Sequence, residues 1–136
     1  FTPHFRPAVG ADMAEGRARA AREPGTIADS RPAGRFTGEV PESRPGLRSC
    51  HIPGSVSMPG GTLTANGRLK SPDDVLALVA ASGLDLEQPI ITSCGSGVAA
   101  STLALALDIA GAGQVAVYGG SWPEWGAQPD TPVAQG

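Results

Sequence analysis

The feature that most constrains the fold is a short apolar strand that runs directly into a glycine-containing turn and then into a helix. Residues 90–93 (Ile-Ile-Thr-Ser) follow Pro89 and precede Cys94-Gly-Ser-Gly97. From residue 98 to 110 the chain is rich in Ala and Leu and lacks Gly and Pro, which predicts a helix that ends at Gly111. Strand–turn–helix units of this kind are typical of parallel sheets whose connecting helices lie on the sheet faces.

The rest of the chain repeats this alternation. Asp12, with Glu15 three residues later, predicts one helix start, and Ser71-Pro-Asp-Asp74 predicts another. We therefore expect an α/β fold with a mostly parallel sheet and helices on both faces. The expected helices are 12–22, 71–83, 98–110 and a short turn or helix at 121–126; the expected strands are 26–29, 55–58, 90–93 and 115–118; and residues 30–50 and 60–70 are expected to be loops.

The helix at 98–110 offers two apolar faces. Leu103 and Leu107 lie on one face, and Val98, Leu105 and Ile109 lie on another. We expect both faces to be available for packing against the core.

Composition excludes several classes of protein. With 136 residues, 40% of them apolar, the chain suffices for one domain with its own core. No apolar run approaches the roughly 18 residues of a membrane span, and the net charge of −3 with scattered basic residues argues against nucleic acid or a membrane as partner. The only cysteines, Cys50 and Cys94, are too few for a disulfide scaffold or a zinc site, so no metal is expected. Free thiols and the lack of a recognisable signal peptide predict a cytoplasmic protein.

Cys94 has the sequence surroundings of a reactive thiolate. It follows a buried strand, at the sheet edge where open α/β folds bind ligands. Gly95 and Gly97 allow the backbone to curl around the sulfur, and the next helix directs its positive end toward the same place. This predicts a lowered pKa for Cys94 and a loop that stabilises a second sulfur bonded to it. A buried structural cysteine is the alternative, whereas phosphatase chemistry would require Arg at the position of Ala100.

The segment Cys94-Gly-Ser-Gly-Val-Ala-Ala100 resembles the active-site loop of the 3-mercaptopyruvate sulfurtransferases, in the rhodanese superfamily. The resemblance continues, in order, through most of residues 26 to 126. The further motifs are Asp29-Ser-Arg31, Gly34-Arg-Phe36, Glu42-Ser-Arg44, His51-Ile-Pro-Gly54, Ser71-Pro72 and Gly120-Ser-Trp-Pro-Glu-Trp125. The chain departs from the family pattern at Ala99, where Thr is usual, at Gly119, where Asp is common, and at Cys50, which replaces Gly or Pro.

This resemblance implies a rhodanese-like fold and a particular domain. Family members contain two tandem rhodanese domains, and the active cysteine lies in the C-terminal one. Residues 11–136 are accordingly expected to be the C-terminal catalytic domain, and the Pro-containing residues 1–10 the remnant of an interdomain linker. An N-terminal rhodanese domain would then be missing from this chain.

The resemblance also implies an activity. Cys94 would take sulfur from 3-mercaptopyruvate, release pyruvate and pass the sulfur from its persulfide to a thiol, thioredoxin or cyanide, with no metal or organic cofactor. Two alternatives remain open: thiosulfate as the sulfur donor, and a non-catalytic rhodanese module that only binds a partner.

The site residues follow from the same resemblance. Arg35 and Arg44 would bind the carboxylate and carbonyl oxygens of the substrate, a role suited to a planar guanidinium, although each also fits a solvated loop residue. Ser96 would relay the substrate's thiol proton, with a His and an Asp of the other domain, or it is simply a small turn residue. The loop residues assigned to substrate binding are Gly95, Gly97 and Val98.

The remaining polar and aromatic residues of these motifs are expected to be structural. His51 lies in a turn that opens a strand, and Asp29 ends a strand where it supports the long loop. Trp122 and Trp125 are expected to pack in the core rather than contact substrate.

Overall fold

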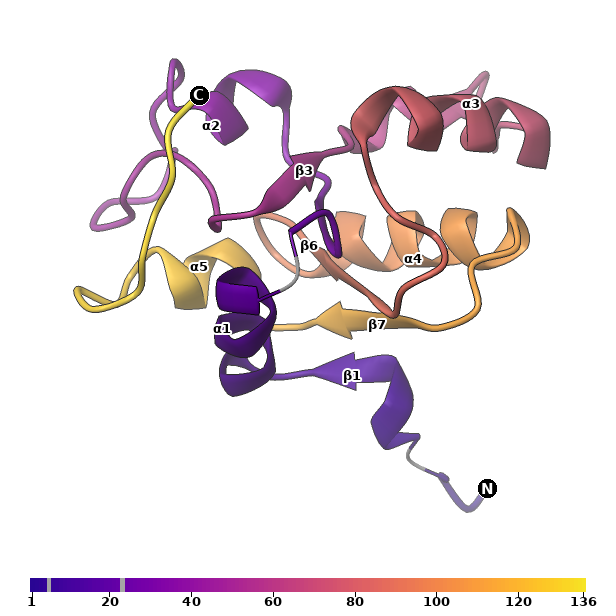
Figure 1. Ribbon diagram of the computed structural model, residues 1–136, viewed down its shortest axis with the longest axis horizontal. Helices are drawn as coiled ribbons and strands as arrows, with labels where there is room; N and C mark the ends of the chain where they lie inside the picture. The colour runs from indigo at the N-terminus through magenta and orange to yellow at the C-terminus, as the bar shows by residue number, and fades with distance from the viewer. Residues whose placement is uncertain (5, 23) are drawn as a thin grey trace.

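Within the residues that the computed structural model describes, 1–4, 6–22 and 24–136, five strands form one parallel sheet at the centre of the domain (Figure 1). In their order across the sheet they are β1 (Gly10–Ala11), β7 (Val115–Tyr118), β6 (Ile90–Ser93), β2 (Ile27–Asp29) and β3 (Ser55–Ser57). The strand β6, which leads to Cys94, is therefore the central strand. This arrangement confirms the predicted parallel sheet.

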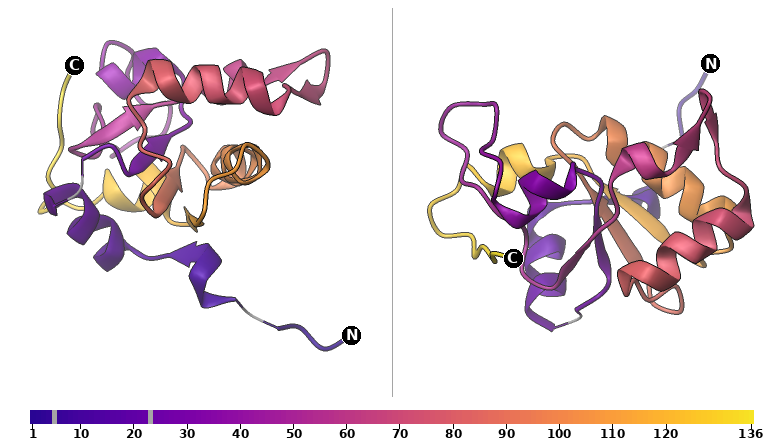
Figure 2. Two further views of the ribbon diagram at one scale, coloured as in Figure 1. Left: turned by 45° about the vertical axis from the view of Figure 1, so that its right-hand side comes forward. Right: turned by 90° about the horizontal axis from the view of Figure 1, so that it is seen from above.

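Helices cover both faces of the sheet (Figure 2). The helices α3 (Pro72–Ser82) and α4 (Val98–Ile109) contribute to one apolar cluster, and α5 (Ser121–Trp125) contributes to the other, against which α1 (Met13–Arg22) also packs. Adjacent strand residues alternate between the two clusters: Ile27 and Ile91 face α5, whereas Ala28 and Ile90 face α3 and α4. No helix in the described part of the chain is long and apolar enough to cross a membrane.

The predicted helix starts are confirmed by their caps. A carboxylate oxygen of Asp12 accepts a hydrogen bond of 2.9 Å from the backbone N–H of Glu15. The hydroxyl of Ser71 accepts one of 3.2 Å from the N–H of Asp74. Both bonds satisfy backbone donors that the first helical turn leaves without partners, which is why these residues could be recognised in the sequence.

The segment 30–50, expected to be a loop, contains the short helix α2 (Ala33–Thr37). Its one buried side chain, Phe36, stacks on the ring of His51 at 3.8 Å between centroids. Gly38 ends the helix with a φ of 86°, in the left-handed region. The helix is stabilised by this contact with a distant residue, so apolar periodicity within the segment could not reveal it.

The segment 60–70, also expected to be a loop, contains a turn of 3-10 helix and a small hairpin. The two strands of the hairpin pair antiparallel, and the turn residues Asn66 and Gly67 both have positive φ, of 52° and 74°. An Asn-Gly pair favours this type of two-residue turn. The elements are η2 (Gly60–Thr62), β4 (Thr64–Ala65) and β5 (Arg68–Leu69).

Two other differences concern the helix α4 and the start of the chain. Leu103 and Leu107 are fully buried, as expected, but Val98, Leu105 and Ile109 are 74%, 51% and 52% exposed. The prediction of a second packed face was wrong, because α4 meets the sheet and α3 from one side only. At the start of the chain, a 3-10 turn, η1 (Pro7–Val9), leads into β1, which pairs with β7 at the sheet edge.

Candidate active site

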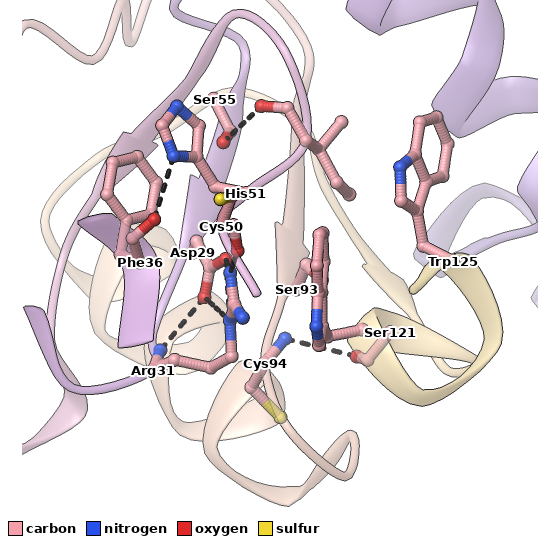
Figure 3. A network of polar contacts seen from close by, with 12 residues as sticks. Asp29, Arg31, Phe36, Cys50, His51, Ser55, Ser93, Cys94, Ser121 and Trp125 are labelled. Atoms are coloured by element: carbon pink, nitrogen blue, oxygen red, sulfur yellow. Dashed lines mark hydrogen bonds and ion pairs between the residues drawn. The ribbon is translucent and has the colours of Figure 1, made fainter. Parts of the chain in front are cut away.

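Cys94 lies at the end of the central strand β6, in the turn to α4 (Figure 3). Its backbone is fixed from both sides by the start of α5. The N–H of Cys94 donates a hydrogen bond of 3.1 Å to the hydroxyl of Ser121, and its carbonyl accepts one of 2.9 Å from the N–H of Trp122. The residue is 1% exposed, so the sulfur is buried at the C-terminal edge of the sheet.

The turn directs backbone N–H groups at the sulfur of Cys94. The N–H of Gly97 donates to Sγ at 2.8 Å, and the N–H of Ser96 donates at 3.2 Å. Gly97 has a φ of 87°, and a Cβ at this position would lie 3.2 Å from the carbonyl oxygen of Gly119. Glycine is therefore required at 97 for the loop to close around the sulfur. Gly95 does not adopt a positive φ, so the predicted curling depends on Gly97.

This arrangement stabilises the ionised form of Cys94. Burial by itself raises the pKa of the thiol, but the N–H groups of Ser96, Ala100 and Gly97, together with the nearby hydroxyl of Ser121, lower it by more. The net effect is a pKa below the usual value for cysteine, which confirms the predicted direction. A sulfur atom that accepts several hydrogen bonds in this way is suited to carry a negative charge.

Ser121 was not recognised as a site residue from the sequence. It is fully buried, its φ of 50° is unusual for a residue other than glycine, and its hydroxyl donates to the carbonyl of Tyr118 at 2.7 Å. The hydroxyl therefore bridges the end of β7 and the backbone of Cys94. The motif Gly120-Ser-Trp122 contained this residue, but its contact with Cys94 depends on two neighbouring strands of the sheet.

Replacing Ser121 with alanine should raise the pKa of Cys94, because one of the groups that lowers it is removed. The rate of alkylation by iodoacetamide should rise with pH, and its midpoint in the unmodified protein should lie below that of free cysteine. In Ser121→Ala the midpoint should move to higher pH. The exposed Ser43→Ala variant is the control, and equal midpoints in all three proteins would contradict the assignment.

Arg35 and Arg44 lie in the segment that leaves the sheet at the end of β2. Arg35 is half-buried in α2, and Arg44 is exposed seven residues after that helix. Among the described residues, no hydrogen bond or ion pair engages either guanidinium. Both charged groups are therefore available to an anionic ligand.

A mostly apolar hollow of about 460 Å³ adjoins the loop of Cys94. Ala99, where the family pattern has Thr, contributes a methyl group rather than a hydroxyl to its wall. The other lining residues are Ser30, Pro32, Ala33, Pro59, Gly60 and Gly61. The hollow lies between the start of α4 and the start of α2, the helix that carries Arg35.

The residues expected to be structural have partners that fit this role. His51 is buried, and its Nδ1 donates to the carbonyl of Phe36 at 2.8 Å, since a carbonyl can only accept. Trp122 and Trp125 are fully buried, and their indole N–H groups donate to the carbonyls of Arg48 and Pro132. These contacts confirm the prediction for all three residues.

Comparison with known proteins places the chain in a family. The profile of the Rhodanese-like domain family matches residues 12–128, so the chain belongs to this family. It is 48% identical over 107 residues to the 3-mercaptopyruvate sulfurtransferase of Escherichia coli K12, and 46% identical over 114 residues to the thiosulfate sulfurtransferase of Rattus norvegicus. These alignments cover 79% and 81% of the chain but only 38% of each relative, so the chain spans about two fifths of their length.

The solved structures agree with this assignment. The crystal structure of SseA from Escherichia coli, described as showing the rhodanese fold of 3-mercaptopyruvate sulfotransferases, superposes with a TM-score of 0.76 at 36% identity. The superposition covers 90% of this chain and 45% of SseA. The predicted rhodanese-like fold is thereby confirmed.

Proposed function

We propose that this chain is a catalytic rhodanese domain that transfers sulfur from 3-mercaptopyruvate through a persulfide on Cys94. The observation that carries the proposal is the set of donors around Sγ, which lowers the pKa of Cys94 and would equally stabilise a terminal persulfide sulfur. Relatives named 3-mercaptopyruvate sulfurtransferase support the choice of substrate.

The proposed reaction begins at the thiolate of Cys94. The sulfur of Cys94 bonds to the sulfur of mercaptopyruvate, and the carbon–sulfur bond of the substrate breaks with its electron pair moving to carbon. The thiol proton of the substrate ends on that carbon, so that pyruvate leaves and Cys94 holds a persulfide. Ser96, an exposed residue whose backbone N–H donates to the sulfur, is proposed to carry this proton.

The two free arginines support a 2-oxo acid as donor. The carboxylate and the neighbouring carbonyl oxygen of mercaptopyruvate are acceptors that two guanidinium groups can bind together. Arg35 and Arg44 are proposed for these roles, and Gly95, Gly97 and Val98 are proposed to line the substrate site. A thiol, a thioredoxin-type protein or cyanide is the proposed sulfur acceptor.

Alanine at Arg35 or at Arg44 should lower kcat/KM for mercaptopyruvate about 30- to 150-fold, the equivalent of about 2–3 kcal/mol for a lost charge-assisted hydrogen bond. Steady-state assays of pyruvate release measure this, and the exposed Arg68→Ala is the matched control. Wild-type kinetics in both variants would contradict the assignment. Faster turnover of thiosulfate would favour the alternative donor, and no turnover of either donor would favour a binding module.

The boundaries of the domain belong to the same proposal. Residues 11–136 are proposed to be the C-terminal catalytic domain of a two-domain protein and residues 1–10 the linker, whose last residue, Gly10, already pairs with Val117 at the edge of the sheet. The coverage of only 38% of each relative supports this assignment. A second rhodanese domain would then be the partner that completes the active site.

A further inference from the structure

A buried arginine, drawn beside Cys94 in Figure 3, connects four parts of the structure. Arg31 forms ion pairs of 2.7 Å with Asp29, at the end of β2, and of 2.8 Å with Glu42. It also donates a hydrogen bond of 2.8 Å to the carbonyl of Cys50, and its guanidinium lies 4.3 Å above the ring of Trp122. All three charged side chains are nearly inaccessible, with exposures of 1% for Arg31, 1% for Asp29 and 4% for Glu42.

Glu42 is the point at which this cluster holds the segment that carries Arg44. In the described structure, the ion pair of Glu42 with Arg31 is the one hydrogen bond or ion pair that joins residues 41–47 to the rest of the domain. Leu47 packs partly against the core at the far end of this stretch. Arg44 lies between these two attachments and has no described polar partner of its own.

We infer that Glu42 is a positioning residue for substrate binding, which holds the segment that carries Arg44 through its buried ion pair with Arg31. The inference rests on the proposed function, since it assigns Arg44 to the carboxylate of a 2-oxo acid. Without Glu42 the backbone around Arg44 would lose its polar attachment, and the guanidinium would sample positions away from the substrate. The loop of Cys94 would be unaffected, because its donors come from residues 96–100 and from Ser121.

Glu42 is a better test of this role than Arg31. Removing Arg31 would leave the carboxylates of Asp29 and Glu42 buried without a counter-charge, which would destabilise the whole domain. Removing Glu42 leaves Arg31 paired with Asp29 by three hydrogen bonds. The effect of Glu42→Ala should therefore be concentrated in the segment that it holds.

The experiment measures steady-state pyruvate release from mercaptopyruvate for Glu42→Ala, Glu42→Gln and the control Glu39→Ala, which removes an exposed carboxylate just before this segment. Glu42→Ala should raise KM about tenfold while kcat stays within about twofold of the unmodified protein. Glu42→Gln, which keeps an acceptor for Arg31, should show a smaller rise. The pH profile of Cys94 alkylation should remain unchanged. If Glu42→Ala does not fold, the rise in KM of Glu42→Gln tests the positioning role of Glu42.

A double-mutant cycle with Arg44→Ala distinguishes positioning from a general loss of stability. If Glu42 acts through Arg44, then Glu42→Ala should add nothing to the KM of Arg44→Ala. Additive effects, an unchanged KM in both Glu42 variants, or a shifted alkylation profile would overturn this inference but leave the proposed function in place. An unchanged kcat/KM in Arg44→Ala would instead contradict the proposed role of Arg44 in substrate binding, and the inference with it.

Discussion

Replacing Cys94 with serine should abolish the uptake of sulfur from a donor. A serine hydroxyl is not ionised near neutral pH and forms no persulfide, so the donors of the loop would have no anionic sulfur to stabilise. Incubation of the unmodified protein with mercaptopyruvate should add one sulfur atom, and peptide mapping by mass spectrometry should place it on Cys94. Cys94→Ser should take up none and should release no pyruvate.

The second cysteine provides a matched control for this experiment. Cys50 is also buried and free, but no backbone N–H groups are directed at its sulfur among the described contacts. Its carbonyl instead accepts a hydrogen bond from Arg31. Cys50→Ala should therefore gain one sulfur atom as the unmodified protein does. A label on Cys50, or uptake that persists in Cys94→Ser, would show that the nucleophile has been misassigned.

Features that depend on a few neighbouring residues could be predicted from the sequence. Asp12 and Ser71 cap helices because their side chains reach N–H groups three residues away. Cys94 could be recognised because the strand before it and the glycine and helix after it are contiguous. The hairpin at Asn66-Gly67 belongs to the same class and was missed, although its turn residues are a strong local signal.

Features that depend on contacts between distant segments could not be predicted in this way. The burial of Arg31 requires Glu42, Cys50 and Trp122 to surround it, and none of these is a near neighbour in the sequence. The role of Ser121 depends on the pairing of β6 with β7, which brings Tyr118 beside Cys94. The motifs indicated that such residues matter, but only the structure shows which backbone groups they hold.

The proposed reaction includes a proton transfer, and this chain offers few groups that could assist it. Ser96 and Arg44 are exposed, and interactions between charges are weaker where water raises the local dielectric constant. The sequence contains two histidines. His4 is exposed near the start of the chain, and His51 is buried with its Nδ1 bonded to the carbonyl of Phe36. No described hydrogen bond joins either histidine to Ser96, so the proton relay proposed for Ser96 would need a histidine from outside this chain.

A second rhodanese domain placed before residue 1 should therefore raise kcat for mercaptopyruvate at least about 100-fold over residues 1–136 alone, since general acid–base assistance is typically worth about 10²- to 10⁴-fold. Steady-state kinetics on the two proteins measure the difference. Alkylation of Cys94 should proceed at similar rates in both, because the donors to its sulfur all belong to this chain. Equal kcat values would mean that residues 1–136 already supply the proton-transfer groups, and Ser96 would then act without a partner domain.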